Sequence, residues 1–133
     1  MSNDEISDLE KTGQLAFEQL FDEGVVVVNR IWYDSEADKI EKNDYMTMGR
    51  GAHNGIKKKN IAVLCCDYYE VKNRYDGTEL DAPLRDFWIL LFIRTDESSP
   101  WTLDDYGIAS KGAYNIMQKE SEKWDKLHPS PVG

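Results

Sequence analysis

Residues 87 to 93 form an unbroken apolar run, FWILLFI, and no other part of the sequence constrains the fold as strongly. Successive side chains of a β-strand point to opposite faces of a sheet, so a strand of this composition must be covered on both faces. The turn signal Asp76-Gly77 precedes it, and we expect the strand to begin at Pro83. A polar turn and a second run with strand character follow, TDESSP and WTLDDYGI. The pattern predicts a central strand that continues through a hairpin into the last strand of the sheet.

A second long strand is predicted ahead of this run. Residues 60 to 75, NIAVLCCDYYEVKNRY, alternate between two mainly apolar rows, and Asp67 is an acidic interruption of one row. The adjacent Cys65 and Cys66 point to opposite faces of such a strand, so they cannot readily form a disulfide with each other. We interpret both cysteines as core residues.

Helices are predicted near both ends of the chain and between the first two strands. Residues 4 to 22 place apolar side chains three and four positions apart, as an amphipathic helix does. Residues 24 to 34 are rich in β-branched and aromatic side chains and predict a strand or a continuation of that helix. Residues 35 to 48 are typical of a helix capped by Ser35, and residues 110 to 127 of a final helix.

These elements predict the α+β class: an N-terminal helix packed on a strongly bent antiparallel sheet of about four strands, with a C-terminal helix. A chain of 133 residues that is 41% hydrophobic has the size and content for one core. We expect residues 1 to 128 to form a single domain and residues 129 to 133 a flexible tail, because the prolines there cannot continue a helix. We also expect the helices to cover only one face of the central strand, which leaves the other for a partner or ligand.

The predicted elements are an N-terminal helix and then long antiparallel strands, and the last two strands are an apolar run, a polar turn and WTLDDYG. This arrangement resembles the cystatin-like α+β roll of the nuclear transport factor 2 superfamily. The similarity covers residues 4 to 109. That superfamily includes isomerases, dehydratases, ligand carriers and interaction domains, so the resemblance implies a fold and no single activity. The sequence departs from the pattern in its middle segment, which has few apolar helix residues, and in the helix after the last strand.

The charge balance excludes several classes of partner. The chain has 25 acidic and 16 basic residues, a net charge of −9, which repels phosphate backbones and anionic lipid surfaces. We therefore expect no nucleic-acid binding. The N-terminus lacks the basic and apolar regions of a signal peptide, and no segment reaches about 20 apolar residues. We expect no membrane insertion and a cytoplasmic location for the chain as given, although a fragment of an anchored or exported protein would look the same.

Two carboxylates are candidates for general-base catalysis. Asp67 lies in an otherwise apolar row, and a carboxylate that faces a half-dry cavity is able to accept a proton near neutral pH. Asp105 shares a strand face with Trp101 and Leu103, and alternation places Asp104 on the opposite face. The alternatives are hydrogen bonding or solvation of Asp67 at a bend and exposure of Asp105 at a strand end, and we favour these structural roles.

Tyr69, Trp88, Trp101 and Tyr106 are candidates for ligand binding. Their rings could line an apolar cavity or form a dimer surface across the sheet, and the alternative is ordinary core packing. No metal or cofactor is expected, because the two histidines lie far apart and the cysteines are adjacent. His53, in the segment GRGAHNG, belongs to an anion site or to a solvated loop, and we favour the loop because no nucleotide-binding fingerprint is present.

The function that these observations favour is non-enzymatic: a binding or protein-interaction domain that uses an apolar sheet face or cavity. The expected partner is a second copy of the chain or another protein, with a small apolar ligand as another occupant. The first alternative is a small isomerase or dehydratase-like enzyme with Asp67 or Asp105 as the base. The second is an acidic inhibitor or immunity protein that masks a basic partner.

Overall fold

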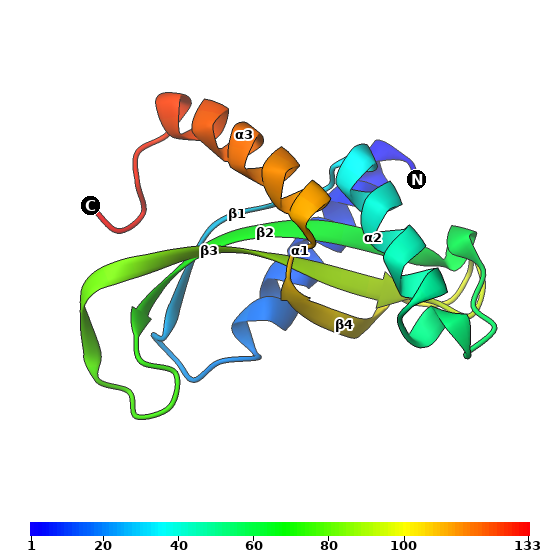
Figure 1. Ribbon diagram of the computed structural model, residues 1–133, viewed down its shortest axis with the longest axis horizontal. Coiled ribbons are helices and arrows are strands. Elements are labelled where there is room, and N and C mark those ends of the chain that lie inside the picture. Colours follow the sequence, from blue (N-terminus) through cyan, green and yellow to red (C-terminus); the bar gives the residue numbers. More distant parts are fainter.

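The computed structural model describes residues 1–133 and has the expected α+β architecture, one antiparallel sheet between helices (Figure 1). Two short 3-10 turns, η1 and η2, lie between the second helix and the second strand. The elements are, in chain order, α1 (Asn3–Glu18), β1 (Val26–Trp32), α2 (Ser35–Thr47), η1 (Arg50–Ala52), η2 (Lys58–Asn60), β2 (Ile61–Lys72), β3 (Glu79–Ile93), β4 (Thr102–Ile108) and α3 (Lys111–Leu127).

The sheet is an open meander with the order β1-β2-β3-β4, and every neighbouring pair is antiparallel. β3 lies between β2 and β4, as the apolar run predicts. The register of β1 against β2 shifts between Val28 and Arg30. The register of β3 against β4 shifts as well: opposite the step from Leu91 to Phe92, β4 contains one extra residue, Asp104. A residue inserted in this way changes which face the neighbouring side chains reach.

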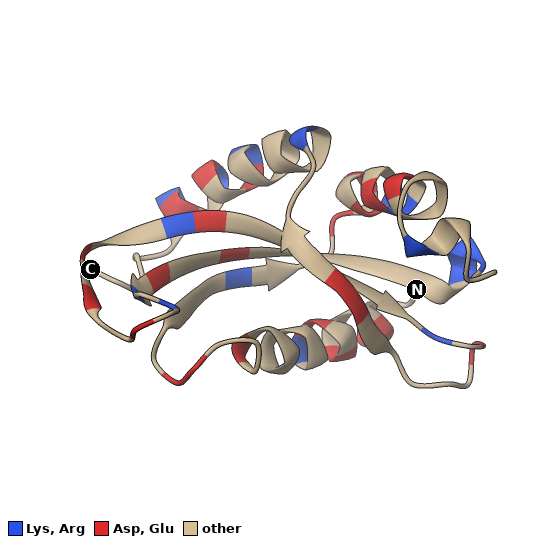
Figure 2. Ribbon diagram, turned by 60° about the horizontal axis from the view of Figure 1, so that its bottom comes forward, with Lys and Arg blue, Asp and Glu red and all other residues tan.

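Helices cover both faces of the sheet, so the expectation that one face lacks a helical cover is wrong. α1 lies on one side, hereafter the α1 face, and α2 and α3 lie on the other, the α2–α3 face (Figure 2). Alternation along β2 sends Cys65 to the α2–α3 face and Cys66 to the α1 face, and both thiols are free and buried. The core is therefore two apolar layers separated by the sheet.

α1 packs closely on the sheet because its contact surface includes a glycine. Ser2 accepts a hydrogen bond from the backbone N–H of Glu5 and caps the helix. Leu9, Gly13 and Phe17 are buried at the three-four spacing that the sequence predicts. A Cβ atom at Gly13 would lie 2.6 Å from Cδ1 of Leu64, so a larger residue fits only if the buried Leu64 side chain or the helix shifts.

α2 is held in place by polar as well as apolar groups, in keeping with its weak apolar pattern. Its N-cap is Asp34 and not Ser35, because the Asp34 carboxylate accepts from the first free N–H groups of the helix. Buried Asp38 accepts a hydrogen bond of 2.8 Å from the backbone N–H of Val63 in β2. Buried Glu41 accepts one of 2.8 Å from the backbone N–H of Ser110, at the start of α3. These bonds satisfy backbone groups that apolar side chains would leave unpaired.

Two element boundaries differ from those predicted. β3 begins at Glu79 and so contains Pro83, where the sequence predicted its start. β4 pairs only with residues 88 to 93, so the N–H that Pro83 lacks costs no hydrogen bond to β4. α1 ends at Glu18, four residues before the predicted end. No helix of the chain combines the length and the apolar content that crossing a bilayer requires.

The close approach at Gly13 yields a stability prediction. Gly13→Val should lower the free energy of unfolding by about 1–3 kcal/mol, because the added carbons overlap the buried Leu64 side chain. Gly112→Ala, in the first turn of α3, is the control: its Cβ meets Ile40 at an ordinary 3.4 Å, and the change should stabilise by about 0.5 kcal/mol. Urea denaturation measures both, and equal effects of the two variants would contradict the assigned role of Gly13.

Candidate functional site

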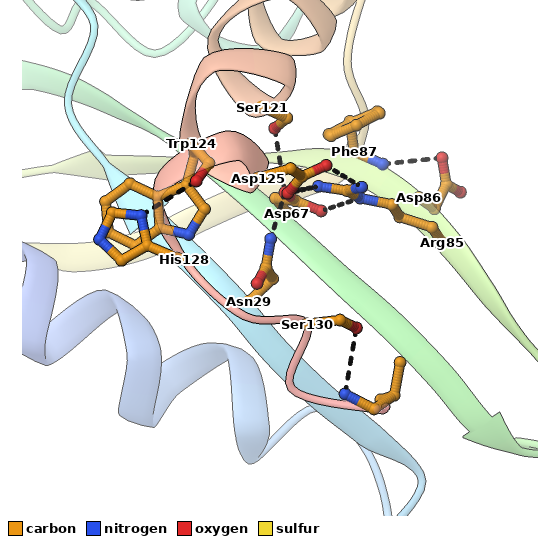
Figure 3. Close-up of polar contacts among 11 residues, drawn as sticks. Asn29, Asp67, Arg85, Asp86, Phe87, Ser121, Trp124, Asp125, His128 and Ser130 are labelled. Atoms are coloured by element: carbon orange, nitrogen blue, oxygen red, sulfur yellow. Dashed lines mark hydrogen bonds and ion pairs between the residues drawn. The ribbon is translucent and has the colours of Figure 1, made fainter.

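The first candidate catalytic residue, Asp67, lies at the centre of a polar cluster between the sheet and α3 (Figure 3). Its side chain is completely buried, like the apolar side chains of Val63 and Cys65 on the same face of β2. Arg85 donates to both carboxylate oxygens, from Nε to Oδ1 at 2.9 Å and from Nη2 to Oδ2 at 2.7 Å. Two further donors reach Oδ2 at 2.9 Å, Nδ2 of Asn29 and Oγ of Ser121.

Arg85 bridges Asp67 to a second carboxylate, on the last turns of α3. Its Nη1 and Nη2 donate to Asp125 at 2.7 and 3.0 Å, so one guanidinium binds two carboxylates. The hydrogen bonds to the two carboxylates raise the pKa of Arg85 above its usual value, first through Asp67 and then through Asp125. The guanidinium also lies over the ring of Tyr69, 5.3 Å from the centroid. We call Asn29, Asp67, Arg85, Ser121 and Asp125 the Asp67 cluster.

This geometry gives Asp67 a structural role. Each of its oxygens already accepts hydrogen bonds from the chain, and no side of the carboxylate faces solvent. A general base must instead reach a proton of a bound substrate. The cluster attaches the C-terminal half of α3, where only Ser121 among the last seven residues is buried, to β1, β2 and β3.

The second candidate, Asp105, does not occupy the face that strict alternation predicts. Asp105 lies opposite Leu91 and Leu103 lies opposite Phe92, so the two side chains belong to different sheet faces. The physical reason is the extra residue Asp104, which interrupts the alternation. Asp105 is exposed and caps the backbone N–H of Tyr106 at 2.9 Å.

Asp104, and not Asp105, makes contacts beneath α2. Oη of Tyr45 donates to Asp104 at 2.6 Å and accepts from Nδ2 of Asn54 at 2.8 Å. Burial and the bond to Asp104 raise the pKa of Tyr45 to about 12. Nη1 of Arg50 lies 3.6 Å from Asp104. These contacts bind the glycine-rich segment to β4, while His53 is exposed on it.

The lysines that follow this segment do not form a dedicated anion site. Lys57 and Lys59 line an open groove of about 600 Å³, but Asp96 and Glu97 line the same groove, so its charge is mixed. No group of three or more His, Cys, Asp or Glu side chains is placed to hold a metal ion. Burial raises the pKa of both cysteine thiols, which disfavours the thiolate that nucleophilic catalysis requires.

The four ligand-binding candidates separate into three places. Trp88 and Tyr106 lie together on the α1 face, with stacked rings whose centroids are 5.9 Å apart. Tyr69 lies on the opposite face beside Arg85. Trp101 precedes β4 at the other end of the α1 face, where Arg94 lies over its ring at 4.4 Å.

Trp88 and Tyr106 contribute to a groove between the end of α1 and the sheet. Its volume is about 260 Å³, and five of its seven lining residues are hydrophobic. Arg74 lines this groove, and its guanidinium lies 5.3 Å from the centroid of the Phe21 ring and 5.6 Å from that of the Trp88 ring. Nε of Arg74 forms an ion pair of 3.2 Å with the Glu70 carboxylate. We call it the aromatic groove, lined by Leu20, Phe21, Asp22, Arg74, Tyr75, Trp88 and Tyr106.

Exposed apolar side chains extend from the aromatic groove over β3 and β4. The pairs Trp88–Ile108 and Leu90–Tyr106 place Ile108 and Tyr106 on the α1 face, and Leu84 lies on the same face of β3. Tyr106 is 48% exposed, Leu84 58% and Ile108 67%. Because α1 ends at Glu18, its cover does not reach these residues. The sequence predicted Trp88 and Tyr106 as candidates for ligand binding. It did not predict that Arg74 lines the same groove, because no residue spacing in the sequence links Arg74 to these rings.

Comparison with known protein families, with curated proteins and with solved structures finds no match to this chain.

The Asp67 cluster predicts a large loss of stability on mutation. Asp67→Asn should lower the free energy of unfolding by about 3 kcal/mol, because it removes the buried counter-charge of Arg85. Asp105→Asn, at an exposed carboxylate, should change it by less than about 0.5 kcal/mol. Urea denaturation followed by circular dichroism compares the two, and an Asp67→Asn protein of unchanged stability would contradict the structural role.

The outer ion pair of the cluster predicts a pH dependence. The hydrogen bond from Arg85 lowers the pKa of Asp125 below its ordinary value of 3.8. A carboxyl whose pKa is lower in the folded state stabilises the fold above its unfolded pKa, and this contribution disappears as the pH falls through the folded value, below 3.8. Because the Asp125 side chain is 44% exposed, the contribution should be less than about 1 kcal/mol.

Denaturation midpoints above and below pH 3.8 measure this contribution. Asp125→Asn should lose less stability on acidification than the natural chain, and Asp125 should account for the difference between the two curves. Parallel curves for the two proteins would show that the ion pair makes no pH-dependent contribution.

Proposed function

We propose that this chain is a non-enzymatic protein-interaction domain that binds a partner at the aromatic groove and at the exposed apolar side chains beside it. The observation that carries the proposal is a group of large apolar side chains on the α1 face that no helix covers: Leu84, Tyr106 and Ile108. Tyr75, which also lines the aromatic groove, is 90% exposed. Contiguous apolar surface of this kind is typical of a binding site. Tyrosine, tryptophan and arginine are the residue types that dominate binding energy at interfaces.

The partner that fits is a protein segment with an apolar or aromatic side chain flanked by basic residues. Asp22 lines the groove, Asp76 is exposed beside Tyr75, and Asp86 lies two residues from Trp88 on the same strand face. The cation of the groove, Arg74, is already paired with Glu70. An acidic rim on a chain of net charge −9 attracts a basic segment. The alternative of an acidic inhibitor or immunity protein expects a basic partner too.

A second copy of the chain is a less favourable occupant. A symmetric dimer would place the same acidic rim on both sides of the interface, and both chains carry −9. Pairing through the free edge of β4 is also opposed, because Asp105 caps the N–H of Tyr106 and the extra residue Asp104 disrupts the ladder. We therefore propose docking on the sheet face, and the predicted homodimer becomes an outcome of the test.

The enzyme hypothesis has less support. Asp67 is enclosed by donors of the chain, Asp105 is exposed at an edge strand, and neither lines the aromatic groove. The resemblance to the nuclear transport factor 2 superfamily remains a prediction, and its interaction domains are compatible with the proposed role.

Selection from a library of random peptides tests the proposal. The natural chain should enrich peptides with a large apolar or aromatic residue next to Lys or Arg, and their affinity should fall as salt concentration rises. Tyr106→Ala should weaken the enriched peptides by roughly tenfold, because it removes an interface aromatic and its stack on Trp88. Met48→Ala, which changes an 80% exposed residue after α2, is the control and should leave binding unchanged.

Three results would overturn the proposal. The first is an absence of enriched peptides, and the second is equal binding by the Tyr106→Ala and Met48→Ala variants. The third is a dimer in light scattering that Tyr106→Ala dissociates, since the second copy would then be the occupant. Circular dichroism of each variant confirms that a loss of binding does not come from unfolding.

A further inference from the structure

Arg30, in the edge strand β1, is turned toward α3 by an irregularity in the strand. The register of β1 against β2 passes from Val28 to Arg30, so Asn29 is an extra residue. Asn29 reaches the Asp67 cluster, and Arg30 lies on the same face two residues before Trp32. Bulges re-aim side chains in this manner and are common near functional sites.

The Arg30 guanidinium lies over two tryptophan rings. Its Cζ lies 4.5 Å from the centroid of Trp32 and 4.5 Å from that of Trp124 in α3. The imidazole of His128 stacks on Trp124, with centroids 3.6 Å apart and planes within 9° (Figure 3). Nδ1 of His128 donates to the Trp124 carbonyl at 3.0 Å, which orients the ring. We call Arg30, Trp32, Trp124 and His128 the arginine stack.

Arg30 is the only arginine of the chain whose guanidinium has no acceptor within the protein. The other four arginines donate to or pair with an acidic, amide or carbonyl oxygen. No hydrogen bond joins the Arg30 guanidinium to the chain, and no carboxylate oxygen lies within 4.0 Å of its nitrogens. The nearest strand partner, Asp67, is already bound by Arg85. Arg30 therefore retains unused donors while its guanidinium contacts two aromatic rings.

A second donor in the stack also has no acceptor. Trp32 is 5% exposed, and its indole Nε1 is buried without a hydrogen-bond partner in the chain. Buried polar groups nearly always have a partner, so the unpaired indole is a second donor of this region that is available to a ligand oxygen. Arg30 itself is only partly buried, which leaves a route for a ligand from solvent.

We propose that the arginine stack is a binding site for a carboxylate ligand. Stacking restrains the guanidinium in one plane and leaves its edge, with paired N–H donors, for hydrogen bonds. A carboxylate matches this edge with two parallel bonds, and the restraint reduces the entropy lost on binding. The site lies on the α2–α3 face, so it is separate from the aromatic groove and does not depend on the proposed protein interaction.

A purely structural role for Arg30 makes a different prediction. The Asp67 cluster contains two carboxylates and one arginine, and Arg30 could serve only to balance its remaining negative charge. A long-range counter-ion of this type needs charge alone, so lysine would replace it without loss. A bidentate site requires the planar fork, so lysine would not.

Titration with sodium acetate, followed by the ¹⁵N-labelled side-chain resonances of the protein, tests the carboxylate site. Saturable shifts should appear at the indole signals of Trp32 and Trp124 and at Nε of Arg30, and not at Trp88. Sodium chloride at equal ionic strength should not produce them. Arg30→Lys should weaken acetate binding by roughly tenfold or more, and Arg30→Gln should abolish it.

Arg94→Lys is the matched control, since Arg94 also lies over a tryptophan, Trp101, but already donates to Asn60. It should leave acetate binding unchanged. Shifts that fail to saturate, that sodium chloride reproduces or that survive in Arg30→Gln would overturn the site. Equal acetate affinity of Arg30→Lys and the natural chain would assign Arg30 to charge balance alone, and tighter binding of inorganic phosphate than of acetate would overturn the carboxylate assignment.

Discussion

Burial of both faces of β2 and β3 is the constraint from which the rest of the structure follows. A strand pair with apolar side chains on its two sides is stable only between two covering layers, because neither face can be left in water without a loss of hydrophobic free energy. α1 provides one layer and approaches closely through Gly13. α2 and α3 provide the other. With only three long helices, the chain has no apolar helix surface to spare, and the cover on the α1 face ends before β4.

Polar side chains compensate for the low apolar content of α2 within the second layer. Asp38 and Glu41 bind backbone groups of β2 and of the α3 start, while Asp67 binds Arg85 and, through it, the end of α3. Buried groups of this kind are costly to desolvate, yet removing one partner costs more because the other is left unpaired. Their benefit is orientation, since hydrogen bonds specify one position of each helix where apolar contacts tolerate several. Asp67, the carboxylate that the sequence offers first as a general base, is thereby used for assembly, and the two proposed binding sites lie where side chains lack internal partners.

Alternation along the chain predicted much of the fold and part of the candidate site. It separated Cys65 from Cys66, placed β3 at the centre of the sheet and identified Trp88 and Tyr106 among the surface aromatics. It did not predict the environment of Asp67, because the neutralising arginine lies 18 residues away and reaches it only across the β2–β3 pairing. His128, the C-cap of α3, contributes a ring to the arginine stack, which no local pattern indicates.

Except at residues 24 to 34, where a strand and a continuation of the first helix both stayed open, the sequence alone determined the type, order and approximate length of the helices and strands, because periods of two and of three to four residues are local properties of the chain. Tertiary structure decided which helix covers which face, which carboxylate finds an arginine and which donors find no acceptor. The extra residues Asn29 and Asp104 show the reason: one inserted residue reverses the face of its neighbours, and its position depends on the partner strand. Partners across a sheet are chosen by the whole chain, and so the roles of Asp67, Asp105 and Arg30 became visible only when the strands were paired.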